Sequence, residues 1–283
     1  MKFQVLIGFI NYNGEIIPAD IPVLNSTNRG FRYGDGLFES IRVTEGNMPL
    51  RDFHFDRLFS SMAMLGFDSP PDFSRNTLLS RILDLCQRNN CHDACRVRLI
   101  VFRGAGTMND VQDNLANYII QAEELPEKQL RMNDAGLELD LFSGIRKTCD
   151  SFSSIKSNNY MLFSLAARQA RLRNLDDAFI LNIHDRLCEA TVSNVFAIRD
   201  KTIYTPPLSE GCIAGVMRRW VQELLRKQNI LCRETPLTVE MIKQCDEIFL
   251  TNAIFGIRWV GRFREITYGN GMTREIFALL NSR

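Results

Sequence analysis

Residues 154–165 read SIKSNNYMLFSL, and the interpretation of the fold begins with this stretch. Polar residues around Lys156 precede an apolar run, which predicts a helix that begins near the lysine and extends to about Asn174. The positive end of a helix disfavours an ammonium group and lowers its pKa. This placement suits a lysine that must react as a neutral amine. The alternative interpretation is an exposed lysine without a function.

The composition excludes several classes of protein. The chain has 283 residues, of which 45% are hydrophobic, and a formal net charge of +1, which indicates a globular protein of one large or two medium domains. No basic run marks a nucleic-acid surface, and no apolar segment approaches the ~18–20 residues of a membrane helix. The amino terminus lacks the cleavage site of a signal peptide. Eight scattered cysteines favour free thiols, so we expect a cytoplasmic protein.

The order of the predicted elements is that of an α+β protein. Asn13-Gly14 is a hairpin signal between two short strand patterns, and residues 30–43 read as a glycine-rich loop that runs into a strand. Helical and alternating apolar patterns predict the remaining elements of the amino-terminal part: helices at 54–65 and 76–89, and strands at 96–102 and 118–122.

Residues 123–133 contain EELPEK and interrupt the apolar pattern, so we predict an interdomain linker there. This linker separates a small α+β domain (residues 1–122) from a larger domain (residues 134–283) that carries Lys156. Beyond the linker we expect a strand, the Lys156 helix, and then further elements: strands at 178–183, 195–199, 202–205 and 247–251, and helices at 215–229 and 273–280.

Six segments carry the residues that suggest chemistry. In chain order they are NRGFRYGDGLFESIR (28–42), HFDRL (54–58), SIKSNNY (154–160), EATVSNVF (189–196), GCIAGVMR (211–218) and TNAIFGIRWV (251–260). Together they resemble the class IV aminotransferases, which are pyridoxal-phosphate enzymes of fold type IV. The resemblance implies a two-domain α+β fold like that of D-amino-acid aminotransferases, with the cofactor between the domains, and a homodimer.

The resemblance also assigns roles to individual residues. Lys156 would bind the cofactor covalently and carry the proton at the substrate Cα, Glu189 would pair with the pyridine nitrogen, and Arg57 would bind the phosphate. The other residues of the implied cofactor site are Asn194, Gly215, Val216, Met217, Asn252 and Ala253. Tyr33, Arg98 and Tyr160 would line the substrate pocket. No metal is expected, because the three histidines lack ligand spacing.

Three functions fit this resemblance. The first is transfer of the amino group of a branched-chain-like α-amino acid to a keto acid, which Arg98 favours. The second is a lyase that splits aminodeoxychorismate into pyruvate and 4-aminobenzoate. Met217 and Ala253 favour this lyase, because branched-chain enzymes carry phosphate-binding threonines at these two places. The third is a binding module without catalysis, which the presence of Lys156, Glu189 and Arg57 argues against.

Overall fold

The computed structural model describes residues 8–110 and 113–281. The chain divides into two compact units, Met1–Gln129 with Lys156–Asn159, and Leu130–Ile155 with Tyr160–Arg283. The domain limits predicted from the sequence stay a prediction. However, residues 123–124 of the predicted linker belong to a strand, and residues 156–159 group with the first unit.

The first unit is built on a five-stranded antiparallel sheet of order β2-β1-β5-β4-β3. Its strands are β1 (Phe9–Tyr12), β2 (Glu15–Pro18), β3 (Gly36–Thr44), β4 (Ala94–Arg103) and β5 (Ala116–Glu124). The predicted Asn13-Gly14 turn joins β1 to β2, and both turn residues have positive φ angles, 51° and 101°. The strand β3 forms an edge of this sheet, which leaves one side of its backbone open for another segment.

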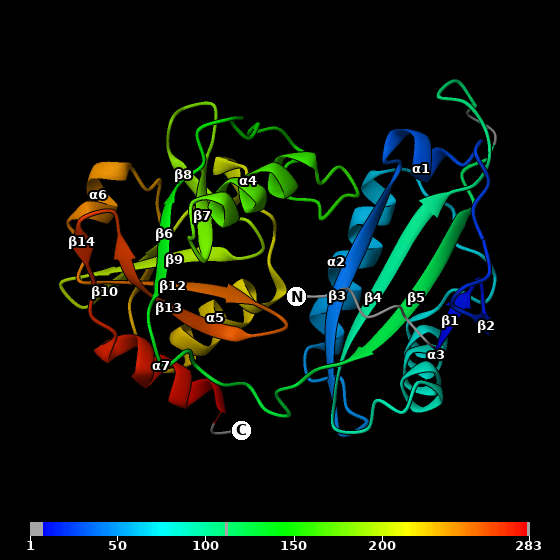
Figure 1. Ribbon diagram of the computed structural model, residues 1–283, viewed down its shortest axis with the longest axis horizontal. Coiled ribbons are helices and arrows are strands. Elements are labelled where there is room, and N and C mark those ends of the chain that lie inside the picture. The colour runs from blue at the N-terminus through cyan, green and yellow to red at the C-terminus, as the bar shows by residue number, and fades with distance from the viewer. Residues whose placement is uncertain (1–7, 111–112, 282–283) are drawn as a thin grey trace. The chain divides into compact units, whose positions relative to one another are not determined.

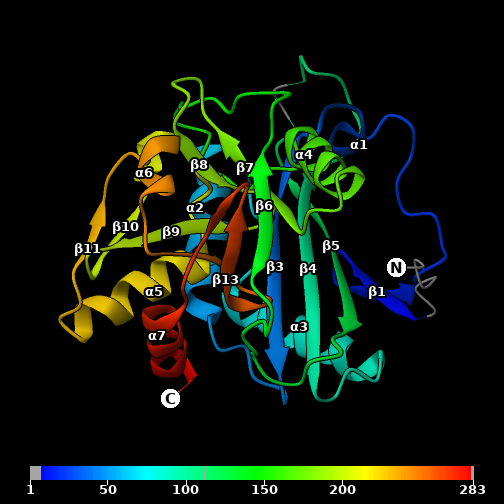
Figure 2. The same cartoon turned by 60° about the vertical axis from the view of Figure 1, so that its left-hand side comes forward.

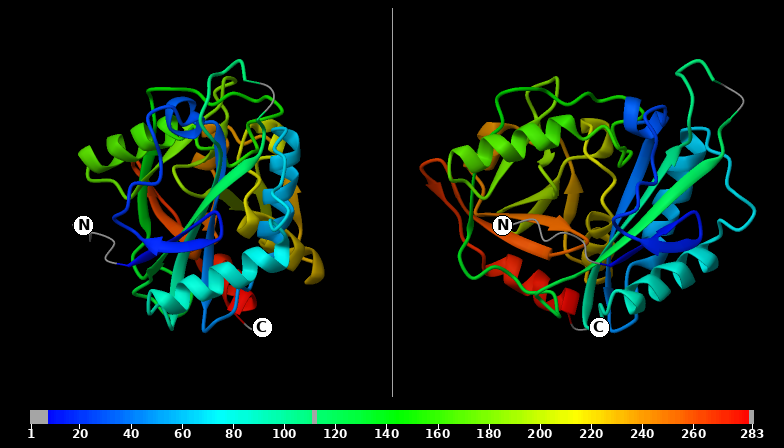
Figure 3. Two further views of the ribbon diagram at one scale, coloured as in Figure 1. Left: turned by 90° about the vertical axis from the view of Figure 1, so that its right-hand side faces the viewer. Right: turned by 45° about the vertical axis from the view of Figure 1, so that its right-hand side comes forward.

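Two long helices lie against one face of this sheet (Figure 3). They are α2 (Arg51–Met64), which packs on β3, and α3 (Arg75–Arg88), which packs on β1, β4 and β5. The apolar stripe of α2 is buried as the spacing predicts, with Phe55, Leu58 and Met62 at most 2% exposed. The prediction of a loop at residues 30–35 is wrong, because α1 (Arg29–Tyr33) forms there. The Asn28 side chain caps this short helix and Gly34 ends it with φ of 66°.

The second unit contains a nine-stranded mixed sheet (Figures 1 and 2). The strand order is β11-β10-β9-β12-β13-β6-β7-β8, and β14 pairs with β13. The strands are β6 (Leu137–Leu141), β7 (Asp177–Leu181), β8 (Leu187–Ala190), β9 (Asn194–Arg199), β10 (Thr202–Thr205), β11 (Cys232–Glu234), β12 (Glu247–Asn252), β13 (Gly256–Phe263) and β14 (Ile266–Thr267).

Helices pack against this sheet and complete its cores. They are α4 (Met161–Leu172), α5 (Val216–Lys227), α6 (Val239–Lys243) and α7 (Gly271–Asn281), with the short 3-10 turn η1 (Leu208–Glu210). The helices α5 and α7 pack on β12, and α4 packs on β7. Both units combine helices with mostly antiparallel strands, which confirms the predicted α+β class. Within the described residues, no helix has the length and apolar character needed to cross a membrane.

Candidate active site

Lys156 lies in an extended segment that pairs with the edge strand β3. The backbone N–H of Phe38 donates to the Lys156 carbonyl (3.0 Å), and the N–H of Asn158 donates to the Gly36 carbonyl (2.9 Å). The predicted helix start at Lys156 is therefore wrong, since α4 begins only at Met161. Backbone groups that pair with a strand cannot enter a helix at the same time. The position of Lys156 is thus fixed by sheet pairing and not by a helix terminus.

Glycines on the first unit allow this close approach. A Cβ atom at Gly36 would collide with the Val101 carbonyl and the Asn158 side chain. Gly34 has a φ of 66° and lies against the Asn159 side chain. The glycine-rich loop that the sequence shows before β3 is therefore the surface on which the lysine segment docks.

Arg57 on α2 is held by Glu39 on β3. The guanidinium donates from Nε to Glu39 Oε1 (2.8 Å) and from Nη2 to Oε2 (2.5 Å), and His54 Nδ1 lies 2.7 Å from the same Oε2. Glu39 and His54 are both 1% exposed. Burial raises the pKa of Glu39, but Arg57 and His54 outweigh it and lower this pKa from 4.5 to about 2. The sequence assigned no role to Glu39 or His54, and the structure shows that they orient Arg57.

Burial also lowers the pKa of His54, and the charges of Arg57 and Lys156 act in the same direction, although Glu39 opposes them. The ring is therefore neutral at neutral pH and donates its Nδ1 proton to the carboxylate. Lys156 pairs with β3, and Arg57 is bound to Glu39 of the same strand. Two predicted cofactor residues, Arg57 and Lys156, thus belong to one unit.

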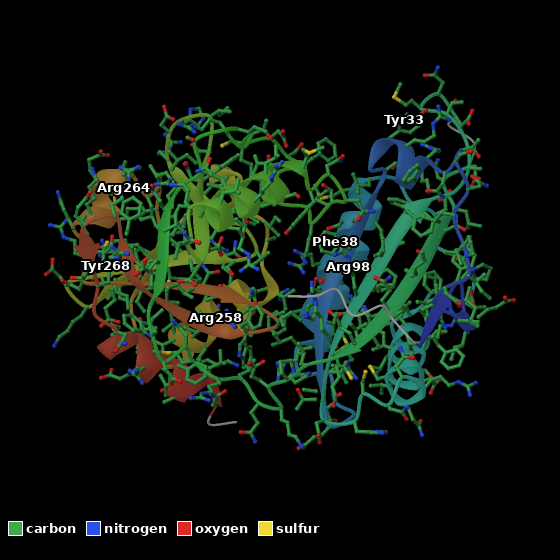
Figure 4. All side chains as sticks on the ribbon, viewed as in Figure 1. Tyr33, Phe38, Arg98, Arg258, Arg264 and Tyr268 are labelled. Carbon is green, nitrogen blue, oxygen red and sulfur yellow. The ribbon has the colours of Figure 1, made fainter. Side chains whose placement is uncertain are left out.

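Two cationic side chains lie over the ring of Phe38. Lys156 Nζ lies 4.4 Å and the Arg98 guanidinium carbon 4.2 Å from the centre of its ring. Phe38 and Arg98 come from the neighbouring strands β3 and β4 (Figure 4). Arg98 alternates with the fully buried Val97 and Leu99, which places it on the opposite sheet face, as the strand pattern predicts.

Tyr33, a predicted pocket residue of the first unit, ends α1 and is half-buried. The Arg32 guanidinium lies over its ring at 5.0 Å. Tyr160 belongs to the second unit, where it is the residue before α4 and stacks on Phe163 with the ring centres 4.3 Å apart. Their roles in a substrate pocket stay a prediction.

Glu189 on β8 is a buried carboxylate of the second unit, with 2% of its surface exposed. Its Oε2 accepts a hydrogen bond from the Ile213 backbone (3.1 Å), and its Oε1 forms an ion pair with Lys147. Lys147 was not predicted from the sequence. No periodicity or motif marks it, and only the pairing of its own segment with β7 brings it to Glu189.

The amino terminus of α5 lies beside Asn194. Gly215 is the N-cap residue in an extended conformation, no side chain caps the helix, and no acidic residue lies in its first turn. Asn194 donates to the Ile213 carbonyl (2.8 Å), and a Cβ atom at Gly215 would collide with its side chain. Because Ile213 also donates to Glu189, the structure brings Glu189, Asn194 and the start of α5 together. The side chains of the next two residues, Val216 and Met217, are buried.

The loop after β12 is shaped by the side chain of Asn252, and the predicted role of Asn252 and Ala253 at the phosphate stays a prediction. The Asn252 side chain accepts from the backbones of Ile254 (3.0 Å) and Phe255 (2.8 Å) and donates to Ser193 (3.2 Å). Asn252 therefore shapes the turn that presents Ala253. Its neighbour Thr251 is buried, and the Thr251 hydroxyl has no hydrogen-bond partner among the described residues.

The comparisons with known proteins assign the family. The model of the family described as amino-transferase class IV matches residues 36–263. The chain belongs to the class IV aminotransferase family. This confirms the family resemblance that the six sequence segments indicated.

Relatives of this class IV chain differ in activity. A putative branched-chain-amino-acid aminotransferase of Methanocaldococcus jannaschii is 29% identical over 243 residues, which cover 86% of this chain and 83% of the relative. The aminodeoxychorismate lyase of Bacillus subtilis is 26% identical over 264 residues, with 92% and 88% covered. The solved branched-chain amino acid aminotransferase from Escherichia coli has a TM-score of 0.84 at 22% identity, with 96% and 92% covered. The fold is that of fold-type IV enzymes.

Pyridoxal phosphate is the cofactor of this class IV enzyme, and a further branched-chain aminotransferase of the same fold was solved with pyridoxamine 5'-phosphate. Residues of the second unit fit the phosphate group. Thr251 pairs with Asn194 across β12 and β9, so their side chains share one sheet face, and Asn194 lies against Gly215. An unpartnered buried hydroxyl beside an uncapped helix terminus suits an anion. Among the described residues, no group of three acidic, histidine or cysteine side chains could hold a metal ion.

Proposed function

We propose that the protein is an aminotransferase that transfers the amino group of a branched-chain-like α-amino acid to a keto acid. The observation that supports this function best is the placement of Lys156 and Arg98 on the same Phe38 ring. An amine and a guanidinium at these distances suit a substrate that carries both a reacting Cα and a carboxylate. The family match to the class IV aminotransferases is consistent with this reaction.

In this proposal the predicted cofactor residues take the roles that the family resemblance implies. The bound cofactor supplies a ring that accepts electrons from the substrate Cα. Lys156 attaches the cofactor and moves the proton at Cα, and Glu189 keeps a proton on the ring nitrogen. Arg57, fixed by Glu39, and the start of α5 hold the phosphate. Arg98 orients the substrate carboxylate.

Cleavage of aminodeoxychorismate to pyruvate and 4-aminobenzoate is the second candidate function. Met217 and Ala253 bring no hydroxyl to the phosphate site, and Met217 is 3% exposed with its side chain in the core. The similarity to the Bacillus subtilis lyase extends over 92% of the chain. A lyase needs one substrate and no keto-acid acceptor, so the two functions are separable by their products.

Product analysis tests this proposal. The purified protein with pyridoxal phosphate is incubated with branched-chain L-amino acids and 2-oxoglutarate, and separately with aminodeoxychorismate. We expect glutamate and the matching branched-chain keto acid in the first reaction. Release of 4-aminobenzoate in the second reaction, without glutamate in the first, would assign the lyase. A Lys156→Ala variant is the control, and it should form neither product at the wild-type rate.

We also propose that the protein acts as a homodimer in the cytoplasm. Phe31 and Met108 on the first unit are each 73% exposed, which supports a partner surface there. All eight cysteines are free thiols, which fits a reducing compartment. Sedimentation equilibrium would give the oligomeric state, and a monomer at micromolar concentration would contradict the dimer.

A further inference from the structure

Lys147 and Glu189 form an ion pair, and both side chains are buried. Lys147 is 9% exposed and Glu189 is 2% exposed. The backbone of Lys147 is fixed on both sides, since its N–H donates to Leu181 (3.0 Å) and its carbonyl accepts from Ile183 (3.0 Å). Glu189 lies on β8, which pairs with β7 along the same edge of the second unit (Figure 2). Strand pairing therefore fixes the backbones from which both charged side chains extend.

Two thiols belong to residues around this carboxylate. Cys188 Sγ lies 3.9 Å from Glu189 Oε1, and Cys212 directly precedes Ile213, whose backbone N–H donates to Glu189. Burial raises the pKa of both thiols, to about 12 for Cys212, so both are neutral at neutral pH. Burial lowers the pKa of Lys147, but Glu189 outweighs it and the net shift is upward, so the lysine stays charged. Within the part of the chain that the structure describes, Lys147 is the charged partner of Glu189.

A buried carboxylate without a cation would bind a proton to avoid the cost of a desolvated charge. If such a neutral carboxyl group donates its proton to a ring nitrogen, a negative and a positive charge form in a site without water. This separation of charge costs free energy. A cation next to the carboxylate removes this obstacle, because it stabilises the negative oxygen more than it opposes the more distant ring nitrogen. With the cofactor bound, the proton of this hydrogen bond would then lie on the nitrogen instead of the carboxyl oxygen, and no other bond would change.

We propose that Lys147 is a positioning residue whose ammonium group stabilises the negative charge on Glu189 and thereby favours the nitrogen as the site of the proton in the Glu189–ring nitrogen hydrogen bond. Lys147 acts through Glu189 and does not itself contact the substrate. The inference rests on the proposed binding of the pyridine nitrogen at Glu189. It adds a residue outside the six sequence segments to the machinery that sets the reactivity of the ring.

The first test uses the protein without cofactor. Lys147→Met keeps the length of the side chain and removes its charge, whereas Lys147→Arg keeps the charge. In Lys147→Met the buried Glu189 carboxylate loses its ion-pair partner, so the variant should unfold at a lower temperature than wild type at neutral pH, whereas Lys147→Arg should not. Adding Glu189→Gln should remove this loss, because no unpaired charge is then buried. Arg146→Met, which breaks the exposed Arg146–Asp185 pair next to it, should show no such loss.

The second test measures the nitrogen-15 chemical shift of isotope-labelled pyridoxal phosphate in the same proteins. We expect a shift typical of protonated pyridine in wild type and Lys147→Arg, and a displacement toward neutral pyridine in Lys147→Met. In a Glu189→Gln background, Lys147→Met should cause no further displacement. If Lys147→Met does not fold, Lys147→Gln removes the same charge and takes its place in this comparison.

The outcomes separate the two proposals. An unchanged chemical shift in folded, cofactor-loaded Lys147→Met would overturn the role of Lys147 and leave the proposed function intact. The role would also be overturned if Lys147→Met displaced the chemical shift as far in the Glu189→Gln background as it does in the wild-type background. Lys147 would then act without Glu189. Failure of the wild-type protein to bind pyridoxal phosphate covalently would instead reject the proposed function.

Discussion

The buried carboxylate of Glu39 fixes the position of the Arg57 guanidinium. Its two oxygens accept hydrogen bonds from Arg57, and His54 shares one of them. Without this anchor, Arg57 would be a flexible side chain on the surface of α2 with several rotamers to lose on binding a phosphate. The bidentate pair instead fixes the guanidinium before the cofactor arrives.

Replacing Glu39 with glutamine tests this anchor. Glu39→Gln keeps the shape of the side chain and removes its charge, so we expect the free energy of unfolding at neutral pH to fall by about 1–3 kcal/mol. Affinity for pyridoxal phosphate should fall as well, because Arg57 loses its fixed orientation. Urea denaturation and cofactor titration measure the two effects. Asp56→Asn on the same helix breaks the exposed Asp56–Arg75 pair and should change stability by less than about 1 kcal/mol.

The Glu39–Arg57 pair also predicts how the stability of the protein depends on pH. The pKa of Glu39 is lowered in the folded protein to about 2, from 4.5. Its stabilising contribution is therefore fully present above about pH 4.5 and is lost as the pH falls toward about 2. Glu39→Gln should remove this part of the acid-induced loss of stability. An identical acid profile in the wild type and the variant would contradict the network.

At the level of elements, the docking of the lysine segment on β3 depends on Gly36. A Cβ atom at this position would meet the Val101 carbonyl and the Asn158 side chain, so Gly36→Ala should displace the segment that carries Lys156. We expect loss of the absorbance of covalently bound cofactor although Lys156 itself is unchanged, with a destabilisation of about 1–3 kcal/mol.

A glycine with room for a side chain is the matched control. At Gly269 the nearest atom to an added Cβ would lie 3.7 Å away, so Gly269→Ala should keep the cofactor absorbance of the wild type. Full cofactor absorbance in Gly36→Ala would show that the lysine segment reaches its place without the close pairing with β3.

Local signals in the sequence predicted much of the fold. Asn13-Gly14 predicted the hairpin, and the Phe55, Leu58 and Met62 stripe predicted α2, because turn chemistry and helical periodicity depend on near neighbours. The polar residues after Lys156 predicted a helix start, but their backbone pairs with β3, which lies far earlier in the chain. A pattern read over a short stretch of sequence does not contain such a long-range pairing.

The residues that support the site were the hardest to predict. Arg57 and Glu189 lie in motifs, whereas Lys147 reaches Glu189 only through its pairing with β7. Asn252 lies in a motif, and its side chain closes the turn that contains Ala253. Sequence patterns predicted the residues of the site, and this prediction stays open, whereas the hydrogen-bond network shows which side chains hold others in place.

At the level of the whole chain, the residues with proposed roles belong to both compact units. The first unit carries the amine of Lys156 with Arg57 and Arg98, and the second carries Glu189 with the start of α5. The family match spans residues 36–263 and so includes all of these positions. The reaction itself is the part that family membership leaves open, since the class contains both aminotransferases and lyases.

The central claim is that Lys156 binds the cofactor, and chemical trapping tests it most directly. The purified protein loaded with pyridoxal phosphate is reduced with sodium borohydride, which makes a lysine–cofactor bond permanent, and its peptides are mapped by mass spectrometry. We predict that the cofactor is attached to Lys156 in wild type and is absent from Lys156→Ala. Attachment to another lysine, Lys147 above all, or no attachment in the wild type, would contradict the account.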